Sequence, residues 1–190
     1  MFENEKFQEI LSILRQGGAI LYPTDTIWGI GCDATNEAAV NKITAIKGRT
    51  PDKGYVLLVD SIEMLKKHVG EVHPRVETLL SFHTRPLTII YEESFGVASN
   101  VLAPDGSVAI RVVQDAFCRE LIAQLGHPLV STSANRSGSP FPAHYGEISS
   151  DILEKVDLVV KYKQDNKERG EPSVIARFNQ EYEELDFLRE

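Results

Sequence analysis

The sequence predicts one α/β domain built on a mixed, twisted β-sheet with helices on its faces. Amphipathic helical segments and short apolar strands are mixed along the chain but do not alternate cleanly, which favours a mixed sheet over an all-parallel one. The last two strands, 173–178 and 184–189, are close enough in sequence to form a hairpin. The length of 190 residues suits a single domain with a substantial core. We therefore predict one domain spanning residues 1–190.

The first half of the chain predicts helices from hydrophobic periodicity and strands from short apolar runs. Apolar side chains recur at helical spacing from residue 4 to residue 16, and Gly17 and Gly18 end that helix. The continuous apolar run at 55–59 is typical of a fully buried strand. The expected order is helix 4–16, strand 19–23, a helix starting at Thr35 or Asn36, strand 55–59, a helix capped by Ser61 and a helix with Pro74 in its first turn.

The second half is predicted from the same signals. Asp115 caps a helix that Gly126 closes, and turn-forming residues mark a loop after the strand at 128–132. The expected elements are strands 87–92 and 107–113, the helix after Asp115, strand 128–132, a helix near 147–155, strand 158–161, a polar stretch at 162–172 and the final two strands.

Composition excludes several classes of protein. The net charge of −8 argues against a broad nucleic-acid-binding face, because phosphate contacts need clustered Lys and Arg. Cys32 and Cys118 lie far apart and predict two reduced, buried thiols rather than a metal site. No apolar run reaches membrane-spanning length, and the start of the sequence does not resemble a signal peptide. We expect a cytoplasmic protein with no membrane partner.

Polar residues gather where predicted strands end, which is where ligands bind in open α/β sheets. The first strand runs into Thr24, Asp25 and Thr26, and Trp28 follows either as plain core or as an apolar wall for a ligand. Ser107 and Arg111 belong to a later strand. These positions are candidates for contacts to a polar ligand.

A basic cluster predicts an anion site. Between Lys42 and Lys53 the chain carries four cations against one acid, Asp52. Cations that complement a helix C-terminus explain one or two of these charges. In a protein of net charge −8, a local excess of Lys and Arg at a loop rich in Gly and Pro favours phosphate binding.

The loop after the strand at 128–132 offers hydroxyls and an amide, in "STSAN", that can donate to anionic oxygens or accept from an amine or ribose. A turn or helix cap is the alternative reading of these residues. The sequence has no Walker loop, no G-x-S-x-G motif and no evident nucleophile–base pair. Any chemistry is therefore expected to rest on positioning and charge stabilisation.

In combination and order, these motifs resemble the YrdC-like family, and specifically its L-threonylcarbamoyladenylate synthases. The resemblance runs from about Gly17 to the end of the chain through "YPTDTIWGIGCDA", "KGRTPDKG", "VAIRV", "PLVSTSANRSG" and "EPSVI". It implies a YrdC-like fold and a nucleotidyltransferase that makes threonylcarbamoyl-AMP and pyrophosphate from ATP, L-threonine and bicarbonate. It also implies Mg²⁺ with the ATP, and downstream tRNA-modification enzymes that take the product.

The resemblance assigns roles to particular residues of this sequence. Its paired K-x-R and S-x-N signature is met by Lys47, Arg49, Ser133 and Asn135, with Lys47 and Arg49 expected to be catalytic. The implied threonine site comprises Thr26, Arg111 and Ser131, and the implied nucleotide site comprises Lys47, Arg49, Lys53, Ser107, Ser133, Asn135 and Ser173. No metal ligand is assigned.

The sequence departs from the family pattern in places. "SVIARF" stands where Ser-Thr-Ile-Val-Asp is commoner, and Thr50 follows Arg49 where many relatives have Pro. The alternatives are a divergent YrdC-like nucleotide-binding paralogue that performs another carbamoyl or acyl adenylation, and an RNA-binding module with weak RNA contact. Residues 162–172 are the candidates for closing the cavity.

Overall fold

A computed structural model of the chain describes residues 4–50, 53–179 and 184–189. Asp52, the acid of the basic cluster, lies outside these residues. The helices are α1 (Asn4–Arg15), α2 (Glu37–Lys47), α3 (Ile62–Val69), α4 (Pro74–Phe82), α5 (Ala116–Leu125) and α6 (Ser150–Leu153), with 3₁₀ turns η1 (Ser99–Val101) and η2 (Tyr145–Glu147). The strands are β1 (Ile20–Tyr22), β2 (Gly29–Gly31), β3 (Val56–Val59), β4 (Leu87–Tyr91), β5 (Val108–Val112), β6 (Leu129–Ser133), β7 (Leu158–Val159), β8 (Val174–Asn179) and β9 (Glu184–Arg189).

The strands form one mixed sheet, which confirms the predicted fold class. Their order is β7-β1-β2-β6-β3-β5-β4-β8-β9. Three neighbouring pairs are parallel, β1 with β7, β3 with β5 and β4 with β8, and the other pairs are antiparallel. The predicted hairpin is β8 with β9 at one edge.

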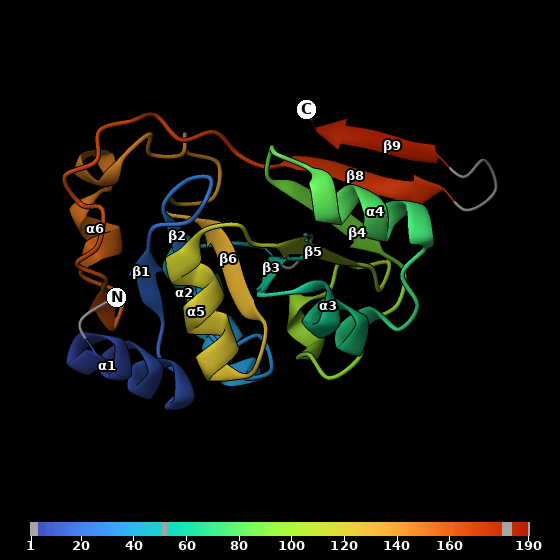
Figure 1. Ribbon diagram of the computed structural model, residues 1–190. Coiled ribbons are helices and arrows are strands. Elements are labelled where there is room, and N and C mark those ends of the chain that lie inside the picture. The colour runs from blue at the N-terminus through green and yellow to red at the C-terminus, as the bar shows by residue number, and fades with distance from the viewer. Residues whose placement is uncertain (1–3, 51–52, 180–183, 190) are drawn as a thin grey trace.

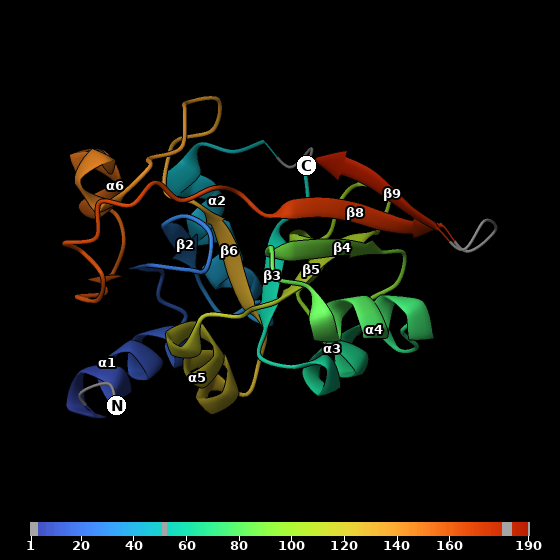
Figure 2. The same cartoon turned by 45° about the horizontal axis from the view of Figure 1, so that its top comes forward.

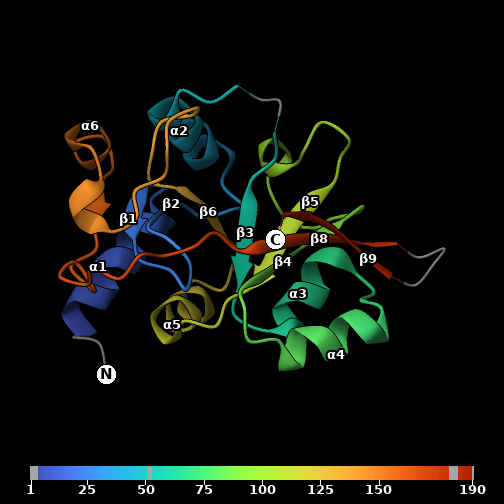
Figure 3. The same cartoon turned by 90° about the horizontal axis from the view of Figure 1, so that it is seen from above.

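The helices cover the sheet in two groups (Figure 1). α1, α2, α5 and α6 surround the half that holds β1, β2 and β6, whereas α3 and α4 lie beside the half that holds β4, β8 and β9 (Figure 2). The chain after α6 crosses from the first half to the second before it enters β8 (Figure 3). The segment between α6 and β8 therefore passes beside the loop between β1 and β2, where Gly170 lies against Thr26.

The helix boundaries follow the predicted caps. The side chain of Asn36 accepts from the Ala39 amide of α2, and Gly48 ends that helix in the left-handed region at φ 57°. Ser61 and Asp115 cap α3 and α5 in the same way. Lys47 is thus the last residue of α2, and the chain turns immediately after it into the basic loop.

Two expectations differ from the structure. The helix predicted near 147–155 is only α6 at Ser150–Leu153 after a 3₁₀ turn, because the backbone of Ile148 and Ser149 is extended and separates the two. The predicted strand 158–161 shortens to β7, which pairs only with β1 at the edge of the sheet.

β2 was not predicted, because a strand of Gly-Ile-Gly has low β propensity. It forms because it lies fully buried between β1 and β6. A Cβ atom on Gly31 would lie 2.6 Å from the Val130 carbonyl oxygen and 2.6 Å from the Tyr22 ring. The glycine is therefore required by close packing across the sheet.

Gly31→Ala is expected to destabilise the protein by about 2 kcal/mol or more, because backbone on β6 must move to admit the methyl group. Urea unfolding followed by circular dichroism measures the loss. Gly146→Ala is the matched control, since its Cβ would meet only the His144 side chain at 3.4 Å. Equal stability of wild type and Gly31→Ala would show that the sheet is looser here than described.

In the part of the chain that the structure describes, none of the helices combines the length and apolar character needed to cross a membrane. Cys32 and Cys118 are free and buried, as predicted. The histidines serve local contacts: His73 accepts from the Arg75 amide at the start of α4, and His127 lies 2.9 Å from Asp33.

Candidate active site

A cavity of about 780 Å³ opens on the face of the sheet formed by β6, β3, β5, β4, β8 and β9. An adjoining pocket of about 250 Å³ shares Arg49, Lys53, Thr132 and Ser133 with it. All of the predicted site residues line one or the other. Thr26, Arg49, Lys53, Ser107, Arg111, Ser131, Ser133 and Ser173 line the cavity, and Lys47 and Asn135 line the adjoining pocket.

Strand register explains why residues distant in sequence share this surface. Side chains paired across adjacent strands, and those two residues further along, face the same side of a sheet. One row across the floor runs Ser131, Val56, Ala109, Ile90 and Arg177. The next row runs Arg111, Thr88, Ile175 and Arg189.

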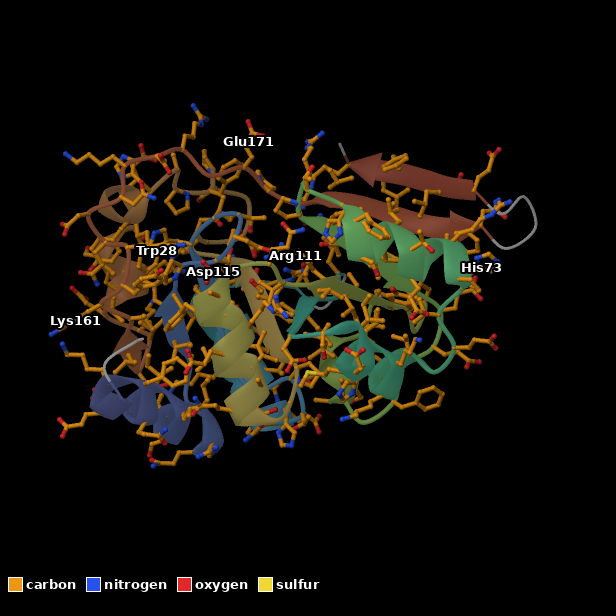
Figure 4. The ribbon with its side chains drawn as sticks, viewed as in Figure 1. Trp28, His73, Arg111, Asp115, Lys161 and Glu171 are labelled. Atoms are coloured by element: carbon orange, nitrogen blue, oxygen red, sulfur yellow. The ribbon has the colours of Figure 1, made fainter. Side chains whose placement is uncertain are left out.

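Arg111 lies at the inner end of the cavity, near the centre of the molecule in Figure 4. Its side chain is 4% exposed, and one terminal nitrogen lies 2.9 Å from Asp25 Oδ1. The same nitrogen donates to Thr26 Oγ1 at 3.3 Å. Arg111 Nε is buried and has no hydrogen-bond partner in the structure. A guanidinium that lines a cavity is suited to a carboxylate.

Lys47 lies at the other end of the site. It is 3% exposed, and its Nζ donates to the backbone carbonyls of Ser133 at 2.6 Å and Asn135 at 2.7 Å. An ammonium has three donors, so one remains for a ligand. Burial, and then the nearby Arg49 charge, lower the pKa of Lys47 to about 8. An incoming anion would stabilise the charged form of this lysine.

Arg49 organises the basic loop. Its guanidinium donates to the carbonyls of Lys53 and Gly54 at 2.9 Å and 2.6 Å and lies 4.5 Å from the centre of the Tyr55 ring. Its Nε is buried without a hydrogen-bond partner. The cation is therefore held in place in the pocket that Lys47 also lines.

Asn135 contributes less directly than its motif predicts. Its Nδ2 donates to the carbonyls of Arg136 and Ser139, so the amide stabilises its own loop. Only Oδ1, buried without a hydrogen-bond partner, remains for another group. As placed here, Asn135 offers an acceptor and no donor.

Two serines are held by neighbours that the sequence did not indicate. Ser107 donates its hydroxyl proton to Asp105 at 2.6 Å, so towards the cavity it offers lone pairs. Ser173 lies 2.8 Å from the Thr88 hydroxyl, and Arg189 donates to its carbonyl at 2.7 Å. Burial, and then the charge of Arg111, lower the pKa of Arg189.

Residues 162–172 form an outer wall. They contribute to a neighbouring pocket of about 390 Å³, which shares only Thr26, Ile27 and Pro172 with the cavity. A Cβ on Gly170 would lie 2.0 Å from the Thr26 carbonyl oxygen, so this segment lies directly against the loop between β1 and β2. Trp28 is buried and packs on Tyr145, as the core interpretation predicts, and it also lines the outer pocket.

A family model of Sua5, YciO and YrdC proteins, described as telomere recombination, matches residues 12–190. The chain belongs to this family. Threonylcarbamoyl-AMP synthase of Vibrio parahaemolyticus is 33% identical over 174 residues, which are 90% of this chain and 93% of that one. The synthase of Vibrio cholerae is 34% identical over 84% of this chain and 86% of its own length.

Solved structures of the Sua5/YciO/YrdC family agree with the fold. Pyrococcus abyssi Sua5 in complex with L-threonine has a TM-score of 0.79 and 26% identity over 93% of this chain. This chain spans about half of that protein, 52% of its length. Escherichia coli YciO, at 21% identity, matches the fold with a TM-score of 0.82 over 99% of this chain and 90% of its own.

The Sua5/YciO/YrdC motifs did not reveal every residue at the site. Asp25 had a signal, because a carboxylate between two threonines at a strand end needs a cationic partner, and Arg111 is that partner. Nothing in the local sequence indicated Arg177 and Arg189, because only the β4–β8–β9 pairing brings the C-terminal hairpin to the cavity.

Proposed function

We propose that this chain is an L-threonylcarbamoyladenylate synthase, a nucleotidyltransferase that makes threonylcarbamoyl-AMP and pyrophosphate from ATP, L-threonine and bicarbonate. One observation carries the proposal. The cavity and its adjoining pocket, which share four lining residues, have the Arg111 guanidinium at one end and the Lys47, Arg49 and Lys53 cations at the other. A carboxylate and a polyphosphate fit those two ends.

The end of the site at Arg111 is the proposed threonine site. The carboxylate of threonine docks on the Arg111 guanidinium, and Thr26 and Ser131 offer hydroxyls to its other polar groups. The threonine amine takes up carbon dioxide from bicarbonate to give a carbamate. The surrounding residues have only to orient that carbamate and shield it from water.

The end of the site at Lys47, Arg49 and Lys53 is the proposed ATP site. A carbamate oxygen forms a bond to the α-phosphorus, and the bond to the departing pyrophosphate breaks. Lys47 and Arg49 stabilise the negative charge that accumulates on the phosphoryl oxygens. The remaining groups surround the nucleotide: Lys53 near the phosphates, Ser107 accepting from a ribose hydroxyl or amino group, and Ser133, Asn135 and Ser173 along the walls.

Magnesium is expected to arrive on the phosphates of ATP. The described residues contain no group of three or more His, Cys, Asp or Glu side chains that could hold a metal. Asp105, the one carboxylate among the described residues lining the cavity, already accepts twice from Ser107. No step of the proposed reaction is therefore assigned to a protein-bound metal.

The partners and location follow from the proposal. Downstream tRNA-modification enzymes would consume the product in the cytoplasm, where ATP, threonine and bicarbonate are available. Direct RNA contact stays a prediction, and the net charge of −8 limits it to weak binding.

Incubation of the protein with ATP, L-threonine and bicarbonate tests the function, with pyrophosphate as the readout. We expect release that requires both threonine and bicarbonate, and a product with the mass of threonylcarbamoyl-AMP. Release that is indifferent to threonine would support the alternative, a related acyl or carbamoyl adenylation. Failure to bind ATP or release pyrophosphate would overturn both.

A further inference from the structure

The loop between β1 and β2 contains a closed set of hydrogen bonds around Thr24. Thr24 Oγ1 donates to the Ile27 carbonyl at 2.7 Å and accepts from the Thr26 amide at 3.1 Å. Thr24 Oγ1 and Thr26 Oγ1 are also 2.9 Å apart. A carbonyl can only accept, so the single hydroxyl proton of Thr24 is committed to Ile27.

This commitment fixes the direction of the bond between the two threonines. Because Thr24 has no second proton to give, Thr26 must be the donor to Thr24. The proton of Thr26 then points away from any ligand, and its remaining lone pairs face Arg111 and the cavity. Thr26 therefore acts towards a ligand as an acceptor only.

Asp25 holds the Arg111 guanidinium, the group that lies next to Thr26. One carboxylate oxygen lies 2.9 Å from the Arg111 guanidinium, and the other accepts from the Gln114 amide at 3.0 Å. Both side chains of the ion pair are more than nine-tenths buried. A guanidinium has no acceptor, so Arg111 presents only donors towards the cavity that it lines.

Thr24 and Asp25 do not line the cavity themselves. They line the outer pocket on the other side of the loop. Any effect they have on a ligand in the cavity must pass through Thr26 and Arg111.

We infer that Thr24 and Asp25 are positioning residues that set the polarity of the amino-acid site. They place one acceptor, Thr26 Oγ1, beside one cationic donor, Arg111. This pattern matches an α-amino acid, whose nitrogen donates and whose carboxylate accepts. The inference deepens the proposed function and rests on it for the identity of the amino acid.

Calorimetric binding of L-threonine tests the role of Thr24. Thr24→Val keeps the shape but removes the acceptor, so Thr26 can rotate its proton into the site, and we expect about 10-fold weaker binding. Thr24→Ser retains the hydroxyl and should stay within about twofold of wild type. Unchanged affinity in Thr24→Val would overturn the inference.

A double-mutant cycle separates polarity from loop shape. If Thr24 acts through the Thr26 hydroxyl, Thr24→Val adds no further loss to a Thr26→Val variant. Additive losses would mean that Thr24 acts through the backbone of the loop, and they would overturn its assigned role.

Asp25→Asn tests the second half of the inference. An asparagine can offer an acceptor either to Arg111 or to the Gln114 amide but not the same charged contact to both, so we expect threonine binding to weaken by about 10-fold or more. The affinity for a non-hydrolysable ATP analogue, measured on the same sample, should remain that of wild type. An equal loss for both ligands would indicate general damage and contradict the inference.

All three experiments measure threonine binding rather than turnover. Wild-type protein that binds threonine but releases no pyrophosphate would overturn the proposed function and leave the polarity test decisive. Wild-type protein that does not bind threonine would overturn this inference.

Discussion

Replacing Lys47 by methionine is expected to lower the rate of threonine-dependent pyrophosphate release by about 10³-fold at saturating substrates. Methionine preserves much of the length and apolar packing of the side chain. It removes the donor proposed for the nucleotide, and it also leaves the Ser133 and Asn135 carbonyls without their partner. Pyrophosphate release under single-turnover and steady-state conditions measures the effect.

Lys47 also gives nucleotide binding a pH signature. Because burial and the Arg49 charge lower its pKa to about 8, the side chain is part neutral in the free protein at pH 8. A bound triphosphate favours the charged form and raises that pKa, so ATP binding at pH 8 should take up protons from the buffer. At pH 6 the lysine is charged in both states and uptake should vanish. Calorimetry in buffers of different ionisation enthalpy detects the uptake, which Lys47→Met should abolish.

Lys42→Met is the matched control, because Lys42 lies on the same helix but pairs with Asp157 at the surface. Exposed ion pairs contribute little, so we expect activity within about twofold of wild type. Equal losses in the two variants would show that a positive charge on α2, rather than the placement of Lys47, supports the reaction.

Much of the fold could be predicted because local signals and burial agree. Asn36, Ser61 and Asp115 cap the helices where their residue types predict caps. β2 could not be predicted, because its glycines carry no strand signal and are explained only by Tyr22 and Val130 on the neighbouring strands. Contacts between strands, unlike caps, leave no trace in the local sequence.

The candidate site also has a part that the sequence predicts and a part that it does not. Short motifs identified the groups that line the cavity, but not which donors and acceptors remain free. Asn135 donates its amide protons within its own loop, and Ser107 donates its hydroxyl proton to Asp105. Arg189 reaches the site only through the pairing of β9 with β8. Hydrogen-bond direction and long-range pairing are properties of the folded chain, so motif spacing alone could not supply them.

Arg111→Gln is expected to destabilise the protein by about 3–5 kcal/mol and to remove measurable threonine binding. The substitution leaves the Asp25 carboxylate, 8% exposed, without its cationic partner, and it removes the donor proposed for the substrate carboxylate. Urea unfolding measures the first effect and calorimetry the second. Arg111→Lys keeps a charge but not the planar fork, so it should recover part of the stability and little of the binding.

Burial, rather than the length of the ion pair, determines this effect, and Arg136 provides the comparison. Arg136 Nε lies 2.6 Å from Asp151, closer than the 2.9 Å between Arg111 and Asp25, but its side chain is 48% exposed and solvent can replace the contact. Arg136→Gln should therefore be indistinguishable from wild type in its unfolding midpoint. Removing both members of the buried pair, in Asp25→Asn with Arg111→Gln, should restore stability relative to Arg111→Gln alone, because no unpaired charge is left inside. Threonine binding should stay absent in the double variant, since Arg111 is the residue assigned to the carboxylate, and its return would assign that contact to another residue such as Arg189.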